Sequence, residues 1–145
     1  MMIKDKNILT YEEARASLNV LEKRLGDDVE LWKMFSKENI EILAGRVVIT
    51  TGANAIAQEP AGLDHIRKCL ARHLYGDFGD IKYCEDWQEN ILTVWTTEGR
   101  VLSRYKVPEE LEQLEELGAE DLYIITNGIG SSEYHYTTIM LVSEY

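Results

Sequence analysis

The spacing of apolar residues changes at Arg46, and this change constrains the fold more than any other feature of the sequence. From Thr10 to Phe35 the apolar residues recur every three or four positions, which is the spacing of one helical face. After Arg46, the run Val47–Ile49 is β-branched and leads to Gly52, which is typical of a strand followed by a turn. We therefore predict helices before this point, and strands mixed with helices after it.

The first predicted helix begins with a capping box. Thr10 and Glu13 have the spacing at which each side chain bonds a free backbone N–H of the first turn. Gly26 suits the left-handed conformation that ends many helices, and Asp27 or Asp28 can cap a second, shorter helix. These signals predict an N-terminal helical hairpin.

The rest of the chain predicts further helices and strands. A helix is expected from Gly62 to Tyr75, and Gly76 ends it. Strands are expected over residues 100–106, 122–126 and 137–142, and an acidic helix begins near Pro108. The predicted class is α+β, a small antiparallel β-sheet with helices packed on one face. Two parts are expected, a helical extension (residues 1–45) and a core domain (residues 46–145).

Negative charge is concentrated in the second half of the chain. The net charge is −11; residues 1–72 hold 11 basic and 11 acidic side chains, and residues 73–145 hold 4 and 15. This distribution argues against direct binding to nucleic acid, where Lys and Arg neutralise phosphates. It favours either simple solubility or a basic partner. The residues predicted to contact such a partner are Glu109, Glu110, Glu112, Glu115 and Glu116.

A second candidate site lies around the end of the predicted helix 62–75. His65, Cys69 and His73 follow one another at intervals of four, but the two histidines are roughly 12 Å apart by helical rise, too far to share one ion. His73 with Asp77 and Asp80 forms a possible functional loop, which could serve acid–base chemistry or metal-assisted hydrolysis. Asp-Gly turns also stabilise loops without any further role. We assign no catalytic residue, metal ligand or cofactor from the sequence.

Apolar runs and cysteines indicate where such a chain would work. No apolar run approaches the ~18 residues that a membrane-spanning helix needs, and residues 1–10 lack the apolar stretch of a signal peptide. Two cysteines, Cys69 and Cys84, are too few for a disulfide scaffold. We expect a cytoplasmic protein with reduced thiols and no contact with a membrane.

An ordered series of short motifs carries a family resemblance. The series is Arg72-His73, Gly76-Asp77-Phe78-Gly79-Asp80, Asn90, Arg100-Val101-Leu102-Ser103-Arg104-Tyr105, Ile124-Ile125-Thr126, Thr137-Thr138-Ile139-Met140-Leu141 and Glu144-Tyr145. It resembles a family of small bacterial proteins on plasmids and other mobile genetic elements, usually labelled plasmid-related. The resemblance spans residues 46–145 and implies a context rather than an activity. The chain differs from the family pattern in its helical N-terminus (1–43), its longer acidic stretch (109–120) and its expanded loop (128–136).

Three functional hypotheses follow. The first is an acidic accessory protein of a mobile element that blocks a basic, nucleic-acid-handling host defence protein, of the anti-CRISPR or anti-restriction type. The second is a small metal-dependent hydrolase that uses His73, Asp77 and Asp80. The third is a non-enzymatic oligomeric scaffold or regulator, with exposed Trp87 and Trp95 or the N-terminal helices as its interface.

Overall fold

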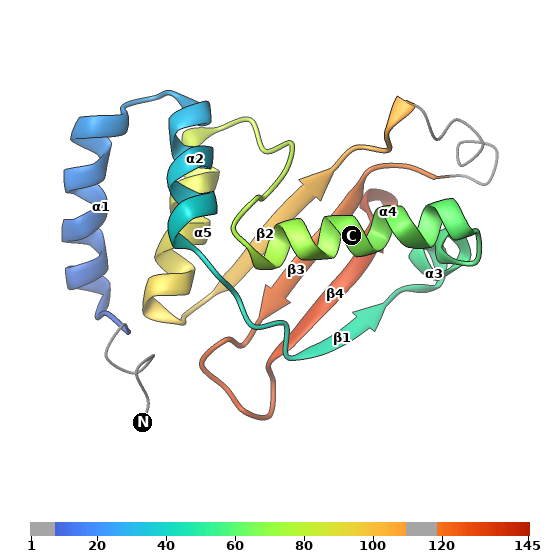
Figure 1. Ribbon diagram of the computed structural model, residues 1–145. Coiled ribbons are helices and arrows are strands. Elements are labelled where there is room, and N and C mark those ends of the chain that lie inside the picture. The colour runs from blue at the N-terminus through green and yellow to red at the C-terminus, as the bar shows by residue number, and fades with distance from the viewer. Residues whose placement is uncertain (1–7, 110–118) are drawn as a thin grey trace.

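The computed structural model describes residues 8–109 and 119–145, and within them it contains five α-helices and one four-stranded sheet (Figure 1). The helices are α1 (Tyr11–Leu25), α2 (Val29–Asn39), α3 (Thr51–Ala57), α4 (Pro60–Leu74) and α5 (Cys84–Thr96). The strands are β1 (Arg46–Ile49), β2 (Arg100–Tyr105), β3 (Leu122–Asn127) and β4 (Tyr136–Leu141), and β4 is followed by a short 3₁₀-helix, η3 (Val142–Glu144). The predicted α+β class is confirmed.

The sheet is mixed, whereas the sequence predicted antiparallel pairing alone. Its strand order is β1-β4-β3-β2, with β2, β3 and β4 antiparallel and β1 parallel to β4. The chain leaves β1 into α3 and α4 instead of turning back through a hairpin, so the partner of β1 is the last strand of the chain. Such a parallel pair requires a long crossover connection, which the helices and strands between β1 and β4 supply.

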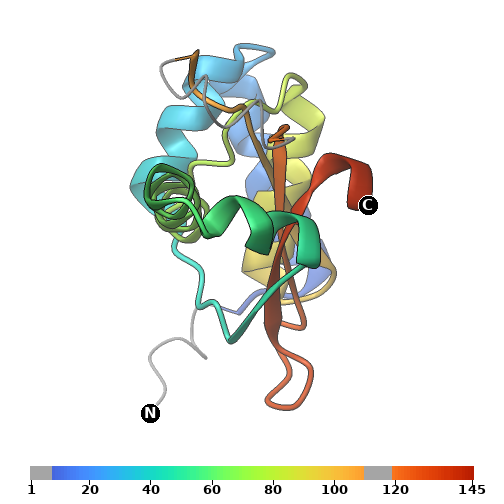
Figure 2. The same cartoon turned by 90° about the vertical axis from the view of Figure 1, so that its right-hand side faces the viewer.

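One hydrophobic core lies between the sheet and the helices α3 and α4. Figure 2 shows α4 on one side of the sheet and η3 on the other. Strand residues that point towards the helices are buried, among them Tyr105, Leu122 and Ile124. They pack with Ile56 of α3 and Ile66 of α4. This face of the sheet also holds the candidate site.

A second hydrophobic core joins α1, α2 and α5 beyond the β2 edge of the sheet (Figure 1). Leu18 of α1 and Trp32 of α2 are fully buried in it, together with Phe78 and Trp87, whose ring centroids are 5.1 Å apart. Residues from both sides of position 45 therefore share this cluster. None of the helices within the described residues has the length and apolar character needed to cross a membrane.

Local signals explain where the sequence-based expectations succeeded and where they were wrong. The capping box is present: Glu13 N–H donates to Thr10 Oγ1 (3.1 Å), and Thr10 N–H donates to Glu13 Oε1 (3.0 Å). The turn expected at Gly52 is instead the first turn of α3, which Thr50 caps through the N–H of Ala53. Helix α5 was not predicted, because its first residue follows Tyr83, which provides no side-chain cap.

Candidate functional site

His73 is fully buried at the end of α4, where it meets strands β2 and β3 of the sheet. Its Nδ1 lies 2.6 Å from the Ser103 hydroxyl of β2, and its Nε2 lies 2.8 Å from the Thr126 hydroxyl of β3. Thr126 is in turn 2.7 Å from the Thr137 hydroxyl of β4, which donates to the carbonyl of Ala44 (2.7 Å). We call this series, from Ser103 through His73, Thr126 and Thr137 to Ala44, the buried polar chain.

The direction of every hydrogen bond in the buried polar chain follows from its last member. A carbonyl can only accept, so the single hydroxyl proton of Thr137 goes to Ala44. Thr126 must then donate to Thr137, and it must accept from the Nε2–H of His73. The Nδ1 of neutral His73 is left as the acceptor for the Ser103 hydroxyl. His73 is therefore in the Nε2–H tautomer, and each of these side chains has its partners.

Burial keeps His73 neutral. It lowers the pKa of this histidine to about 3. Both ring nitrogens are already bonded to hydroxyls inside the protein, so neither is directed at a ligand. The buried polar chain ties α4 to β2, β3 and β4, and its role in the fold is to hold these elements in register.

Asp77 is engaged by cations and by the backbone rather than directed at a cleft. Arg72 Nε lies 2.8 Å from one of its carboxylate oxygens, and Lys33 Nζ lies 3.8 Å from the other. The Gly79 N–H donates to the same carboxylate (3.0 Å). Burial alone would raise the pKa of Asp77, but the hydrogen bonds from Arg72 and Gly79 outweigh it and lower this pKa. Asp77 is thus a charged, structural carboxylate.

The loop that contains Asp80 is bonded to the end of β2. Gly79 forms an isolated parallel bridge with Arg104. In this bridge the Arg104 N–H donates to the Phe78 carbonyl (3.2 Å), and the Asp80 N–H donates to the Arg104 carbonyl (2.7 Å). The Asp80 carboxylate accepts from the backbone N–H of Lys106 (3.0 Å). Gly79 has a φ of +78°, and a Cβ there would lie 2.1 Å from the Arg104 carbonyl, so only glycine fits.

The three residues of the predicted functional loop therefore do different jobs. His73 bonds hydroxyls, Asp77 bonds Arg72, and Asp80 bonds the backbone. Within residues 8–109 and 119–145, no group of three or more His, Cys, Asp or Glu side chains is placed to hold a metal ion. The arrangement gives the hydrolase hypothesis no geometric support.

The earlier turns of α4 hold a buried thiol beside a histidine. Cys69 Sγ lies 3.6 Å from the Nδ1 of His65. Burial raises the pKa of Cys69 to about 12 and lowers the pKa of His65. The thiol is thus protonated and 1% exposed, which describes a core residue rather than a nucleophile.

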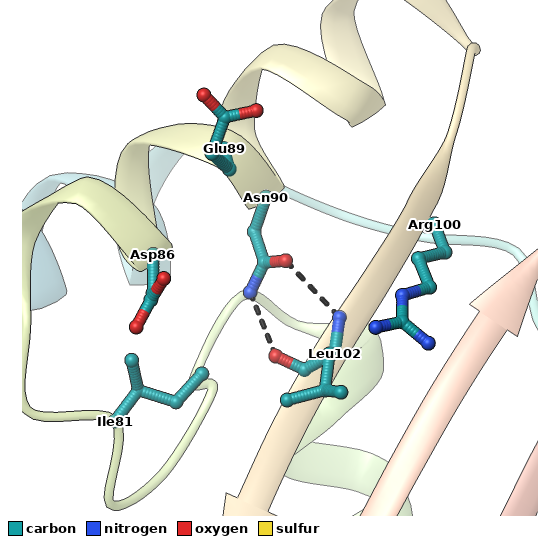
Figure 3. A pocket seen from close by; sticks show the side chains of 6 residues that line it. All are labelled: Ile81, Asp86, Glu89, Asn90, Arg100 and Leu102. Atoms are coloured by element: carbon teal, nitrogen blue, oxygen red, sulfur yellow. Dashed lines mark hydrogen bonds between the residues drawn. The ribbon is translucent and has the colours of Figure 1, made fainter.

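A shallow pocket of about 340 Å³ lies where α5 meets the β2 edge (Figure 3). Asn90 lies at its centre and uses its whole side-chain amide on Leu102: Nδ2 donates to the Leu102 carbonyl (2.8 Å), and the Leu102 N–H donates to Oδ1 (3.0 Å). Asp86 and Glu89 stand on the α5 side of the pocket and Arg100 on the β2 side. Sequence analysis gave Asn90 no role.

Exposed carboxylates gather at one end of the helical layer, where the α1–α2 turn meets the start of α5 (Figure 1). Burial raises the pKa of Cys84, and the nearby charges of Asp27, Glu85 and Asp28 raise it further, which shows how close these carboxylates lie. We call Asp27, Asp28, Glu85 and Asp86 the acidic end; all four are exposed. Of the five glutamates predicted to contact a partner, Glu109 is exposed. Glu110, Glu112, Glu115 and Glu116 lie outside the described residues.

The tryptophans predicted as an exposed interface are not exposed. Trp87 is fully buried, and its Nε1 donates to the Ile81 carbonyl (3.0 Å). Trp95 is half-buried and lines a groove of about 960 Å³ together with Phe35, Ile42 and Ile129.

Comparison of the chain with protein-family models, with curated proteins and with solved structures finds no match.

Proposed function

We propose that the protein is a non-catalytic interaction protein that presents acidic side chains to a basic, nucleic-acid-handling partner. The observation that carries this proposal is a contrast in exposure. The polar groups that could do chemistry, His73 and Asp77, are buried and bonded within the fold, whereas the carboxylates of the acidic end are exposed.

The proposed mechanism is competition with phosphate. Proteins that handle nucleic acids bind the phosphates of the nucleic acid through clusters of Lys and Arg. A surface dense in carboxylates can occupy the cleft that these cationic side chains form. The acidic end is exposed, and the sequence adds five glutamates between Glu109 and Glu116 that could act in the same way. The resemblance to plasmid-related proteins suggests the setting: a mobile genetic element whose product inhibits a host defence protein of the anti-CRISPR or anti-restriction type, in the cytoplasm.

The test is affinity capture with defined competitors. The immobilised protein is exposed to host lysate at low salt, and bound proteins are eluted first with double-stranded DNA and then with high salt. We expect a basic nuclease or nucleic-acid-binding protein in the DNA eluate, because DNA competes for the same cationic side chains. A bound protein that neither DNA nor salt releases would contradict the phosphate-competition mechanism.

Charge-reversal variants locate the surface. One variant carries lysine at Glu109, Glu110, Glu112, Glu115 and Glu116, and a second carries Glu85→Lys and Asp86→Lys. Glu38→Lys with Glu133→Lys is the matched control, because both residues are exposed elsewhere and the change in net charge equals that of the second variant. We expect at least one of the first two to lose the partner while the control retains it. Equal loss in all three would indicate a nonspecific effect of net charge.

A further inference from the structure

One edge of the sheet is open and apolar. Strand β1 is the outermost strand on its side within the described residues, and Val47, Val48 and Ile49 are 46%, 41% and 36% exposed. An uncovered, β-branched edge strand is a template for pairing with another chain. The opposite edge strand, β2, is covered by Asn90 and by the bridge between Gly79 and Arg104.

The backbone of β1 has hydrogen-bonding groups that point away from the sheet. Arg46 N–H donates to the carbonyl of His135, and Thr50 N–H donates to the carbonyl of Ile139, both towards β4. Successive residues of a strand direct their backbone N–H and C=O groups to opposite edges. The N–H and C=O groups of Val47 and Ile49 therefore face outwards. Two donors and two acceptors are therefore available in the geometry of a strand edge.

The outward-facing groups of β1 can pair with those of a second copy of the same strand. In an antiparallel pair of two β1 strands, Val47 of each copy faces Ile49 of the other, and these two pairs exchange the hydrogen bonds. Val48 then lies on the two-fold axis opposite its own copy. All the central pairs are β-branched, which favours cross-strand packing.

The charges at the ends of this pairing are also complementary. Arg46 lies opposite Thr50 of the other copy, on the same face of the sheet. The Thr50 hydroxyl is bonded to the Glu144 carboxylate (2.6 Å), which also accepts from the Gly52 N–H (3.0 Å). The hydrogen bond from Thr50 lowers the pKa of Glu144, so it is charged. No ion pair within the described residues engages Arg46 or Glu144.

We propose that the protein forms a two-fold symmetric dimer in which β1 pairs antiparallel with β1 of a second copy, with Arg46 of each copy opposite Glu144 of the other. The proposal is independent of the proposed function. Because only four residues of each chain form the strand pair, the contact is small compared with stable interfaces, and the self-association is weak and depends on concentration.

Disulfide trapping tests the register. In a non-hydrogen-bonded antiparallel pair the Cα atoms are about 4.5 Å apart, within the range of a disulfide. We expect Val48→Cys to give a covalent dimer under mild oxidation. Val47→Cys is the matched control: Val47 is at least as exposed as Val48, but its two copies are roughly 8 Å apart in this register, beyond the reach of a disulfide. Wild-type protein controls for Cys69 and Cys84, which are buried.

Sedimentation equilibrium tests the dimer without a cross-link. We expect wild-type protein to associate as its concentration rises towards about 1 mM. Val48→Lys places two like charges on the axis, and Arg46→Glu places like charges opposite Glu144; each should weaken association at least about tenfold. Val20→Lys, at an exposed position of α1, should not. A monomer at every concentration, unchanged association of Val48→Lys, or equal cross-linking of Val47→Cys and Val48→Cys would overturn the proposal.

Discussion

Asn90 bonds both the backbone C=O and the backbone N–H of Leu102 with the two ends of its side-chain amide, at 2.8 and 3.0 Å. The amide of α5 thus occupies the place that a neighbouring strand would take beside β2. Two residues further along β2, the backbone of residues 78–80 does the same for Arg104. Together they satisfy the outward-facing backbone groups of Leu102 and Arg104 in this edge strand.

Replacing Asn90 by Asp should destabilise the protein although the two side chains have the same shape. The carboxylate still accepts from the Leu102 N–H, but it faces the Leu102 carbonyl with an acceptor in place of a donor. We expect the free energy of unfolding to fall by about 1–3 kcal/mol in urea titrations at neutral pH. Glu89→Gln, on the exposed neighbour, should change it by less than about 0.5 kcal/mol. Equal effects would show that the amide is not a specific partner of β2.

The buried polar chain can be broken at Thr137 with a matched control next to it. Thr137→Val keeps the shape but leaves the Ala44 carbonyl without this donor and the hydroxyl proton of Thr126 without an acceptor. We expect a loss of about 1–3 kcal/mol of unfolding free energy. Thr138 has its side chain on the opposite face of the sheet, where Thr138→Val should be close to neutral. The two variants are compared by chemical denaturation; a neutral Thr137→Val would contradict the chain of hydrogen bonds described above.

His73 makes stability depend on pH below neutrality. Burial lowers its pKa in the folded protein to about 3, from about 6.5 in the unfolded chain. The unfolded state therefore binds the proton first. The stabilisation is complete above pH 6.5 and is lost progressively as the pH falls towards 3, at a slope approaching about 1.4 kcal/mol per pH unit.

The measurement is the free energy of unfolding between pH 7 and pH 5, above the range in which Asp77 titrates, since the pKa of Asp77 is lowered from its ordinary value. His65, whose pKa burial also lowers, acts with the same sign, so His65→Gln should keep most of the slope. A flat profile in wild-type protein would refute the buried neutral histidine. Nitrogen NMR should in addition find the proton of His73 on Nε2.

Alanine substitutions at Gly79 and at Gly26 distinguish the cost of backbone strain from the cost of a steric clash. Both glycines have positive φ, +78° and +58°, but a Cβ at Gly26 meets nothing within 4 Å, whereas at Gly79 it lies 2.1 Å from a carbonyl oxygen. Gly26 has ψ −136°, outside the left-handed helical region, so Gly26→Ala should destabilise by about 1–3 kcal/mol through backbone strain alone. Gly79→Ala should destabilise by more, because the bridge to Arg104 must open. Thermal melts of the two variants make the comparison, and similar melting temperatures would contradict the close approach.

Parts of the fold with strong local signals could be predicted from the sequence. The capping box of Thr10 and Glu13 predicted the start of α1. The β-branched runs predicted the ends of β3 and β4 to within one residue of the observed bounds. The parallel pairing of β1 was not predictable, because no turn joins β1 to β4 and the pair depends on the whole path between them. Helix α5 lacked a capping side chain at Tyr83, and its apolar residues were not recognised as a helical face.

The candidate site shows a different limit. His73 and Asp77 stood out as chemical residue types, but their roles depend on partners that are distant in sequence. Thr126 and Thr137 are directly opposite each other in the β3–β4 pair, and the loop between these strands is too long to fix that register in advance. The sequence identifies His73 as a residue capable of chemistry. Only the packed structure shows that both of its ring nitrogens are hydrogen-bonded to hydroxyl groups.

The amide of Asn90 also sets a limit on assembly. If two copies join through β1, each free end of the combined eight-stranded sheet is a β2 strand that Asn90 and the backbone of residues 78–80 already occupy. Growth then stops at two copies, because no template remains for a third. Removing that amide would free the backbone N–H and C=O of Leu102 at both ends of the combined sheet, and only the bridge from residues 78–80 to Arg104 would then oppose its growth into filaments.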